Sequence, residues 1–247
     1  MLGALVSILT ACRRCVVLTG AGISAESGVP TFRGKEGLWG RYRPEELATA
    51  EAFRADSRTV WEWYNWRRQL ISKVRPNPGH HAITEMESRF EHFALITQNV
   101  DGLHKTAGTN SILELHGNIN ENKCFDCGRM FESDVEIDPD RIPACLECGG
   151  RIRPNVVWFG EALDTQTVRT AFHEAECADV FFSVGTSAVV HPAASLPVTA
   201  KQRGATLVEI NPEPTPLSDL ADFYFPTRSG ELLPWLVKEL VGKIDAE

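Results

Sequence analysis

Thr-Gly-Ala-Gly-Ile-Ser-Ala-Glu-Ser-Gly-Val-Pro-Thr-Phe-Arg-Gly, residues 19–34, is the stretch of sequence on which the fold prediction depends. It follows Cys-Val-Val-Leu at residues 15–18, a short apolar run that is typical of a buried strand. Gly20 and Gly22 let the backbone turn sharply after this strand and approach a ligand closely, because they carry no Cβ. A strand that enters such a turn, with its amide groups converging, is a common pyrophosphate-binding arrangement. The stretch therefore indicates either a nucleotide site or an ordinary tight turn in an α/β protein.

The remainder of this stretch departs from the usual dinucleotide-binding pattern. The small residues near its start match a dinucleotide fingerprint by spacing, but Gly28 and Pro30 break the helix that should follow. No crossover helix then leads to a second strand with an acidic residue. The segment is therefore predicted to be a loop that passes the phosphates and folds over the ligand, carrying Phe32 and Arg33.

Composition limits the class of protein. The chain has 247 residues, 43% hydrophobic and 23% charged, which is typical of a soluble globular protein. Its formal net charge of -8 argues against direct nucleic-acid binding. No apolar run approaches membrane-spanning length, and residues 1–14 are predicted to be a surface helix instead of a signal peptide. Seven cysteines in such a chain indicate metal binding in a reducing compartment, so the predicted location is cytoplasmic.

The pattern of apolar runs predicts an α/β fold with a parallel sheet. Helical patterns alternate with the runs, and strands that alternate with helices pair in parallel in a doubly wound sheet. Besides residues 15–18, the predicted strands are residues 93–97, 112–115, 180–184 and 206–210.

The segment 35–75 differs in character from the sheet-forming parts of the chain. It is rich in Trp, Glu and Arg and poor in strand-forming residues, so we expect it to be helical. Ser57 is predicted to be the N-cap of a helix that runs to about Val74. Pro76-Asn77-Pro78-Gly79 ends this helical segment, and a further helix is predicted to begin near His80.

Polar side chains follow the predicted strands at the point where each strand ends. Ligands of open α/β sheets bind at this edge, beyond the carboxyl ends of the strands. Amides, hydroxyl groups, an acid and a histidine at these positions favour a nucleotide site over a chance turn. The segments concerned are residues 20–24, residues 98–101, His116, residues 185–187 and Asn211.

Two Cys-x-x-Cys pairs interrupt the α/β pattern. They are Cys124 with Cys127 and Cys145 with Cys148, and 17 residues separate the pairs. Each pair precedes a glycine, as expected for two knuckles whose amides face thiolate sulfur. Four thiolates on two such turns are typical of tetrahedral zinc with a closed coordination shell. The sequence therefore predicts one Zn2+ ion with a structural, not catalytic, role.

Taken together and in order, the motifs of this chain resemble a known family. They are Gly-Ala-Gly-Ile-Ser at 20–24, Pro-Thr-Phe-Arg-Gly at 30–34, Gln-Asn-Val-Asp at 98–101, Leu-His-Gly at 115–117, the two cysteine pairs, Pro-Asn-Val-Val-Trp-Phe-Gly-Glu at 154–161 and Gly-Thr-Ser at 185–187. The chain resembles the sirtuins, NAD-dependent protein-lysine deacylases, over nearly its whole length. Within that family Ala48, Tyr64 and Arg67 resemble class III, the group that includes desuccinylases and demalonylases.

The resemblance implies the same architecture as the residue pattern, with two domains. A Rossmann-like parallel-sheet domain would bind NAD, and a smaller domain would combine a helical part with a zinc-ribbon part. The implied boundaries are 1–34, 76–122 and 154–247 for the Rossmann-like domain, 35–75 for the helical part and 123–153 for the zinc-ribbon part.

The resemblance also implies that NAD is the co-substrate. Ser229 is a departure from the family, since class III relatives often carry another small residue near the adenine, and we expect little effect from it. The implied NAD-binding residues are Gly20, Ala21, Gly22, Ile23, Ser24, Thr31, Phe32, Arg33, Trp39, Gln98, Asn99, Val100, Asp101, Gly185, Thr186, Ser187, Asn211, Pro212, Glu213 and Ser229.

The chemistry requires an in-line nucleophile, protection from water and a base. Breaking the nicotinamide–ribose bond creates an oxocarbenium-like carbon, which an amide oxygen can capture only if water is excluded. Phe32 could shield this carbon, while Asn99 and Asp101 could bind the nicotinamide carboxamide and Ser24 could order a water. His116 is the natural base for a ribose hydroxyl near neutral pH. In the implied mechanism, that hydroxyl attacks the alkylimidate formed from the acyl-lysine, and water releases lysine and O-acyl-ADP-ribose. The other histidines are interpreted as hydrogen-bonded core residues.

Substrate selection is predicted to depend on one helix and one extended segment. Tyr64 and Arg67 are three residues apart and would project from one helix face, although spacing alone does not choose between Arg67 and Arg68. The resemblance favours Arg67 as a fork for an acyl carboxylate, with Tyr64 as a second donor and Ala48 leaving room. The peptide backbone of an acylated protein would pair beside Val157, Trp158 and Phe159, so sequence selectivity should be loose.

Two other functions remain open at this point. A protein mono-ADP-ribosyltransferase would use the same NAD site, but it would not need an acyl pocket beside His116. A non-enzymatic NAD-sensing or zinc-ribbon interaction module would be expected to lack His116, Asn99 or Asp101, and this chain has all three.

Overall fold

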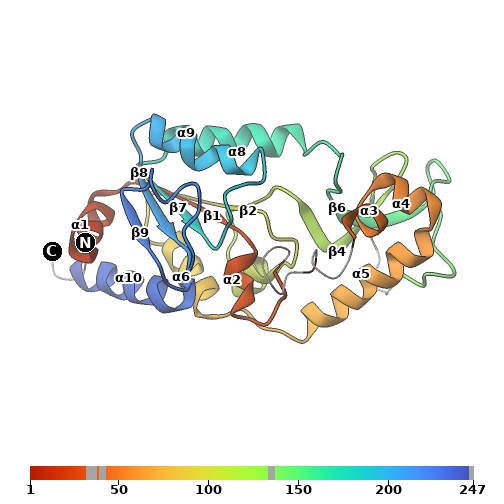
Figure 1. Ribbon diagram of the computed structural model, residues 1–247, viewed down its shortest axis with the longest axis horizontal. Helices are drawn as coiled ribbons and strands as arrows, with labels where there is room; N and C mark the ends of the chain where they lie inside the picture. The colour runs from red at the N-terminus through yellow and green to blue at the C-terminus, as the bar shows by residue number, and fades with distance from the viewer. Residues whose placement is uncertain (32–37, 39–42, 133–136, 245–247) are drawn as a thin grey trace.

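The structure is a computed structural model that describes residues 1–31, 38, 43–132 and 137–244 (Figure 1). Its larger sheet has six parallel strands in the order β3-β2-β1-β7-β8-β9. The five strands predicted from the sequence are confirmed, and the edge strand β9 was not predicted. The strands are β1 (Arg14–Thr19), β2 (His92–Thr97), β3 (Ile112–Glu114), β7 (Val180–Val184), β8 (Thr206–Ile210) and β9 (Phe223–Phe225).

Helices cover both faces of this sheet, as a doubly wound fold requires. In Figure 1, α8 (Thr165–Cys177) and α9 (Leu196–Gln202) lie above the sheet, and α6 (Pro78–Glu87) and α10 (Ser229–Ile244) lie below it. Helix α1 (Leu2–Ala11) lies at the left end of the sheet and packs against α10. Alternate residues of strands β1, β2, β7 and β8 join the two separate apolar cores; along β1, Val17 belongs to one core and Val16 to the other. Shorter helices follow strands β1 and β2 and precede α9: α2 (Ala21–Ala25), α7 (Leu103–Ala107) and the 3-10 helix η2 (Ala193–Ser195).

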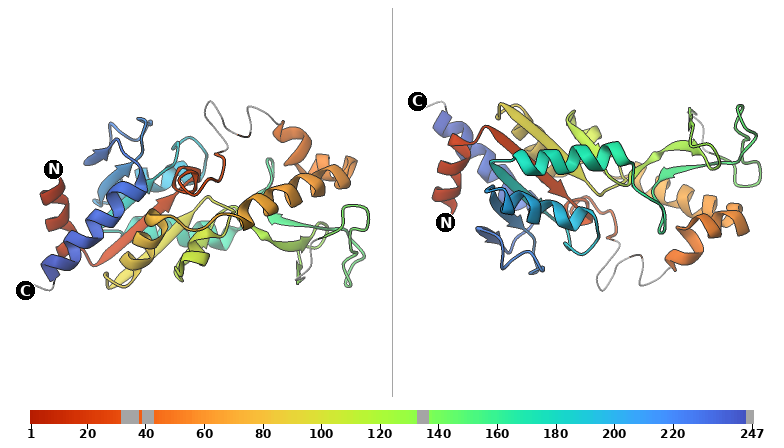
Figure 2. Two further views of the ribbon diagram at one scale, coloured as in Figure 1. Left: turned by 90° about the horizontal axis from the view of Figure 1, so that it is seen from below. Right: turned by 90° about the horizontal axis from the view of Figure 1, so that it is seen from above.

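A second region lies at the end of the molecule away from the two termini (Figure 2). Its antiparallel sheet has the order β5-β4-β6 and packs against helix α5 (Ser57–Ser72). One apolar core joins the two, and Phe53, Trp61 and Trp158 are among its fully buried members. The other elements of this region are α3 (Pro44–Leu47), α4 (Ala50–Ala55), β4 (Gly117–Cys124), β5 (Met130–Phe131) and β6 (Ile152–Val156).

Helix α5 begins one residue earlier than its predicted cap implies. The N-cap is Asp56, whose carboxylate accepts a 3.1 Å hydrogen bond from the backbone N–H of Thr59 and a 2.6 Å bond from its hydroxyl. The prediction of Ser57 as the N-cap is therefore wrong, and Ser57 is the first helical residue. Both residues are good caps by type, but the aspartate is three residues before Thr59, the spacing at which a cap side chain reaches an amide.

The two regions are joined through strand β4, which begins directly after His116 and leads into the first cysteine pair. The smaller sheet therefore extends from Gly117 to Val156. The domain boundaries given above stay predictions. Within the described residues, no helix is long and apolar enough to cross a membrane.

Candidate active site

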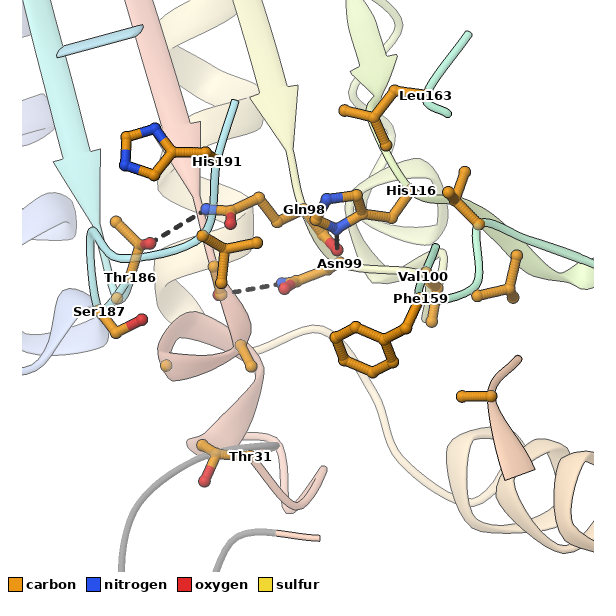
Figure 3. A pocket seen from close by; sticks show the side chains of 18 of the residues that line it. Thr31, Gln98, Asn99, Val100, His116, Phe159, Leu163, Thr186, Ser187 and His191 are labelled. Atoms are coloured by element: carbon orange, nitrogen blue, oxygen red, sulfur yellow. Dashed lines mark hydrogen bonds between the residues drawn. The ribbon is translucent and has the colours of Figure 1, made fainter. Parts of the chain in front are cut away.

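A cavity of about 1070 Å³ lies between the carboxyl edge of the six-stranded sheet and the second region (Figure 3). One wall consists of the loops that follow β1, β2, β3, β7 and β8, and the other consists of α5 and the segment after β6. The predicted site residues that line it are Gly20, Ala21, Gly22, Thr31, Ala48, Tyr64, Arg67, Gln98, Asn99, Val100, His116, Val157, Trp158, Phe159, Gly185, Thr186, Ser187, Asn211, Pro212 and Glu213.

Four of the predicted NAD-binding residues that the structure describes do not line this cavity, and three others are not described. Phe32, Arg33 and Trp39 lie outside the described residues. Ile23, Ser24, Asp101 and Ser229 are described and buried, but they lie behind the surface of the cavity. Ser229 donates a 2.7 Å hydrogen bond to the carboxylate of Glu26 at the start of α10, and it is the neighbouring residues Glu26 and Arg228 that line the cavity.

The glycines after β1 are required by a close approach within the protein itself. The amide of Gly20 donates to the carbonyl of Val184, and that of Gly22 donates 2.8 Å to Gly185. A Cβ on Gly22 would stand 2.7 Å from the backbone of Gly185, and a Cβ on Gly185 would stand 2.5 Å from the nitrogen of Ile23. The turns after β1 and β7 are therefore packed backbone against backbone, which brings two strand tips to one edge of the cavity.

His116 is held in one tautomer by the carbonyl oxygen of Gln98. Its Nδ1 lies 2.9 Å from this oxygen, and because a carbonyl can only accept, Nδ1 carries the hydrogen. The lone pair of the neutral ring is then on Nε2. Burial lowers the pKa of His116 from its ordinary value, more than the hydrogen bond to Gln98 raises it. At neutral pH the cavity therefore contains an unprotonated imidazole with one free basic nitrogen.

The residues beside His116 are fixed by short hydrogen bonds across the strand tips. Asn99 donates 3.1 Å from its side chain to the carbonyl of Gly20 and 3.2 Å to the hydroxyl of Ser24. Gln98 donates 3.0 Å to the hydroxyl of Thr186, on the turn after β7 (Figure 3). This wall is polar and rigid before any ligand binds.

Two further histidines lie buried behind this wall, with ring centroids 4.7 Å apart. His80 accepts a 3.3 Å bond at Nδ1 from the backbone N–H of Asn77, and the Nε2 of His104 is 3.0 Å from the hydroxyl of Thr19. Burial lowers the pKa of His80 to about 4 and that of His104 to about 3, so both are neutral at pH 7. For these two the core interpretation fits, but it is wrong for the exposed residues His81, His173 and His191.

The opposite wall carries the acyl-selecting residues predicted from the sequence. Tyr64 and Arg67 are 1% and 5% exposed, and both line the cavity. The guanidinium carbon of Arg67 lies 5.0 Å from the ring centroid of Trp63 and 5.9 Å from that of Tyr64. Burial lowers the pKa of Arg67, although an arginine remains cationic at neutral pH.

Arg68 faces a different direction. Its guanidinium donates 2.6 Å to the carbonyl of Ile119 and 2.7 Å to the side chain of Asn122, both on strand β4. Of the two adjacent arginines, Arg67 lines the cavity and Arg68 ties α5 to the smaller sheet.

Several lining residues were missed by the sequence interpretation. Trp63 contributes from the turn of α5 that carries Tyr64, and Arg169 from the first turns of α8. His191 lies on the loop after β7. Its closeness in the sequence to the predicted NAD-binding residues Gly185 and Ser187 could have indicated that it lines the cavity. Nothing in local spacing points to Arg169, because α8 reaches the cavity only through the tertiary fold.

The four predicted cysteine ligands come together at the far end of the second region. The sulfurs of Cys124, Cys127, Cys145 and Cys148 all lie within 4.8 Å of one another. Sulfur–sulfur separations of 3.4 Å and 3.8 Å suit a tetrahedral ion with metal–sulfur bonds of about 2.3 Å. Among the described residues, the ligand atoms that come together here are four thiolates, which fit a closed structural zinc site.

Comparison with known proteins gives consistent results. The Sir2 family pattern matches residues 20–192. An NAD-dependent protein deacylase of Aquifex aeolicus is 54% identical over 210 residues, which cover 85% of this chain and 88% of that protein. NAD-dependent protein deacylase 2 of Pyrobaculum aerophilum is 51% identical over 237 residues, covering 96% and 95%.

Solved structures show the same relationship over the whole fold. A Sir2 homolog in complex with NAD superposes with a TM-score of 0.91 at 45% identity, covering 98% of this chain and 94% of that one. An ADP-ribose complex of a Sir2 homologue with the substitution F159A gives a TM-score of 0.94, also at 45% identity, covering 99% and 98%.

Proposed function

Because the chain belongs to the Sir2 family and is an NAD-dependent protein deacylase, we propose that it removes succinyl and malonyl groups, as well as acetyl groups, from protein lysines. The observation that carries this proposal is the pair Tyr64 and Arg67, two buried polar side chains that line the same cavity as His116.

On the sheet side of the cavity, His116 acts as the general base. NAD supplies an electrophilic ribose carbon, and the fixed amide of Asn99 and the turn at Gly20 and Gly22 line the space available to it. The Nε2 lone pair of His116 accepts a proton from a ribose hydroxyl, because Nδ1 is engaged with Gln98. Direct binding of the carboxamide by Asp101 stays a prediction, since this carboxyl lies behind the wall.

On the other side, Arg67 binds the carboxylate of an acidic acyl group. An unpaired carboxylate would be costly to bury in this largely apolar part of the cavity. A guanidinium that is itself buried can compensate with a charge-assisted, two-pronged hydrogen bond. Tyr64 offers a second polar contact, and the small side chain of Ala48 leaves room between α3 and α4.

The partner of the enzyme is an acylated lysine on another protein. A Sir2 structure that is 30% identical to this chain contains a p53 peptide and NAD. The amides of Val157 and Phe159 already donate to the carbonyls of His116 and Ala48, so the peptide main chain would donate to carbonyls of this segment. None of the seven cysteines, all of which lie in the described part of the chain, forms a disulfide, which supports action in a reducing compartment such as the cytoplasm.

The experiment is to incubate the protein with NAD and with matched acetyl-, succinyl- and malonyl-lysine peptides, and to identify the products by mass. We expect free lysine peptide, nicotinamide and the corresponding O-acyl-ADP-ribose from all three. Turnover of the acetyl peptide alone would contradict the proposal. ADP-ribose attached to the peptide would indicate a transferase instead.

A further inference from the structure

We propose that Trp158 is a positioning residue whose indole N–H orients the hydroxyl of Tyr64 and so contributes to the selection of acidic acyl groups. This inference rests on the proposed function, in which Tyr64 and Arg67 bind the acyl carboxylate. It assigns to Trp158 a role of its side chain, distinct from the peptide pairing expected of its backbone.

The direction of the hydrogen bond between the two side chains is unambiguous. The indole nitrogen of Trp158 lies 2.8 Å from the hydroxyl oxygen of Tyr64, and both side chains are at most 2% exposed. An indole N–H can only donate, so the tyrosine oxygen accepts. The hydroxyl hydrogen of Tyr64 therefore cannot point at Trp158 and is left for another acceptor.

The cavity is where an acceptor would arrive. Tyr64, Trp158 and Arg67 all line it, and the Arg67 guanidinium carbon lies 5.9 Å from the Tyr64 ring. A carboxylate bound to Arg67 has lone pairs to spare and presents them within reach of the tyrosine hydroxyl. Because the tyrosine oxygen already accepts a hydrogen bond from the indole N–H, the hydroxyl hydrogen is oriented to donate before the substrate enters.

Trp158 is itself held rigidly, which a positioning role requires. Its backbone N–H donates 2.9 Å to the carboxylate of Glu161, and that carboxylate is ion-paired with Arg153. The guanidinium carbon of Arg153 lies 3.2 Å from the Trp158 ring centroid, and Arg153 also donates 2.6 Å to the carbonyl of Val156. Phe53 packs on the ring from another side, with centroids 5.3 Å apart.

A role in packing alone is the alternative explanation, because a buried indole also fills the core of the second region. The two explanations differ in what removal of the N–H does. Loss of packing weakens turnover of every substrate, whereas loss of orientation weakens turnover of the substrate whose carboxylate Tyr64 contacts. Trp158→Phe keeps an aromatic ring while removing the donor, so it is the informative substitution.

Trp61 provides a matched control. It is a fully buried indole in the same core, and its N–H donates 3.0 Å to the carbonyl of Ile152. It has no contact with Tyr64 through that group. Trp61→Phe therefore removes a buried indole hydrogen bond of similar length without touching the proposed acyl site.

The test compares kcat/KM for succinyl- and acetyl-lysine peptides in the wild type, Trp158→Phe, Tyr64→Phe, the double variant and Trp61→Phe. We expect the succinyl-to-acetyl ratio to fall about three- to tenfold in Trp158→Phe, the size of one hydrogen bond, mainly through the KM of the succinyl peptide. In the Tyr64→Phe background, Trp158→Phe should not change the ratio further. Trp61→Phe should leave the ratio as it is in the wild type.

Equal losses on both peptides in Trp158→Phe, or a ratio that falls further in the double variant than in Tyr64→Phe, would overturn the positioning role. A ratio unchanged in Tyr64→Phe, or no succinyl turnover by the wild type, would overturn the proposed function and this inference with it. A selective Tyr64→Phe effect with an unselective Trp158→Phe effect would overturn the inference alone. Thermal unfolding of each variant shows which losses are due to folding.

Discussion

The two regions that enclose the cavity are stabilised in different ways. The sheet region, which consists of the six-stranded sheet and its covering helices, has an extensive apolar core on each face of the sheet. The zinc region, which consists of the three-stranded sheet with α3, α4 and α5, has one core, and two of the four cysteines, Cys124 and Cys145, belong to it. The first region therefore buries apolar side chains on both faces of its sheet, while the second combines a single core with the zinc site.

The two walls also differ in how they meet a ligand. The sheet region contributes backbone turns and short polar side chains that are already hydrogen-bonded to one another. The zinc region contributes long side chains from a helix, Tyr64 and Arg67. Under the proposed function, the sheet region would serve every acyl substrate and the zinc region would distinguish among them.

The largest expected effect is loss of the zinc site. Structural zinc bound by four thiolates stabilises small domains by about 10–16 kcal/mol in peptide models, so Cys124→Ser should release the metal and unfold the zinc region. Cys177→Ser is the control, because Cys177 lies on α8, outside the cluster. Metal content, together with hydrogen exchange of each region, measures the outcome. A zinc-free protein with a folded zinc region would show that the metal is dispensable.

Replacement of His116 should affect all substrates. Removing a positioned general base typically costs about 10²–10⁴-fold in rate, and His116→Ala should lower kcat/KM to that extent for acetyl and succinyl peptides alike. The exposed residue His173, on α8, provides the control variant His173→Ala. If a folded His116→Ala protein retained turnover within tenfold of the wild type, His116 would not be the base.

The sheet region was largely predictable from the sequence because its signals are local. A buried strand shows as an apolar run, and a ligand edge shows as polar residues directly after it. The four cysteines were predictable for the same reason, since each pair spans one turn. Strand β9 at the edge of the sheet and the long helix α10 were missed, and Pro234 lies within the helical pattern of α10.

The zinc-region wall could not be predicted from spacing, because its residues are brought together by packing. Arg67 and Arg68 are equally placed on the sequence, and only the contact of Arg68 with strand β4 decides which of them faces the cavity. The bond between Tyr64 and Trp158 joins residues 94 positions apart. The glycine motif was located correctly from the sequence. One reason why glycine is required there is the close backbone contact with Gly185, and this contact depends on the tertiary fold.

A smaller and selective effect is expected from Arg67. Truncating one partner of a desolvated charge pair costs about 2–5 kcal/mol, so Arg67→Met should lower kcat/KM for succinyl peptides about thirtyfold or more. The acetyl peptide carries no charge and should lose much less. Arg68→Met is the comparison variant: it should weaken thermal stability and affect both peptides equally, because its guanidinium ties α5 to β4. Equal losses in Arg67→Met would assign Arg67 to structure instead of selection.

The smallest expected effect is a shift of the acidic limb in the profile of kcat/KM against pH. His116 must be neutral to accept a proton, so kcat/KM is highest above its pKa and falls about tenfold per pH unit below it. Because burial lowers this pKa from 6.5, the midpoint of the decline in the free enzyme should lie below pH 6.5, and activity at pH 6.5 should be reduced by less than about half. The measurement is log kcat/KM against pH with acetyl peptide, over the range in which thermal unfolding shows the protein to be folded. Arg67→Met should keep the same limb, since Arg67 belongs to the opposite wall. A midpoint at or above pH 6.5 would mean that the imidazole of His116 is solvated before substrate binds. A midpoint that shifts in Arg67→Met would mean that the two walls of the cavity are electrostatically coupled.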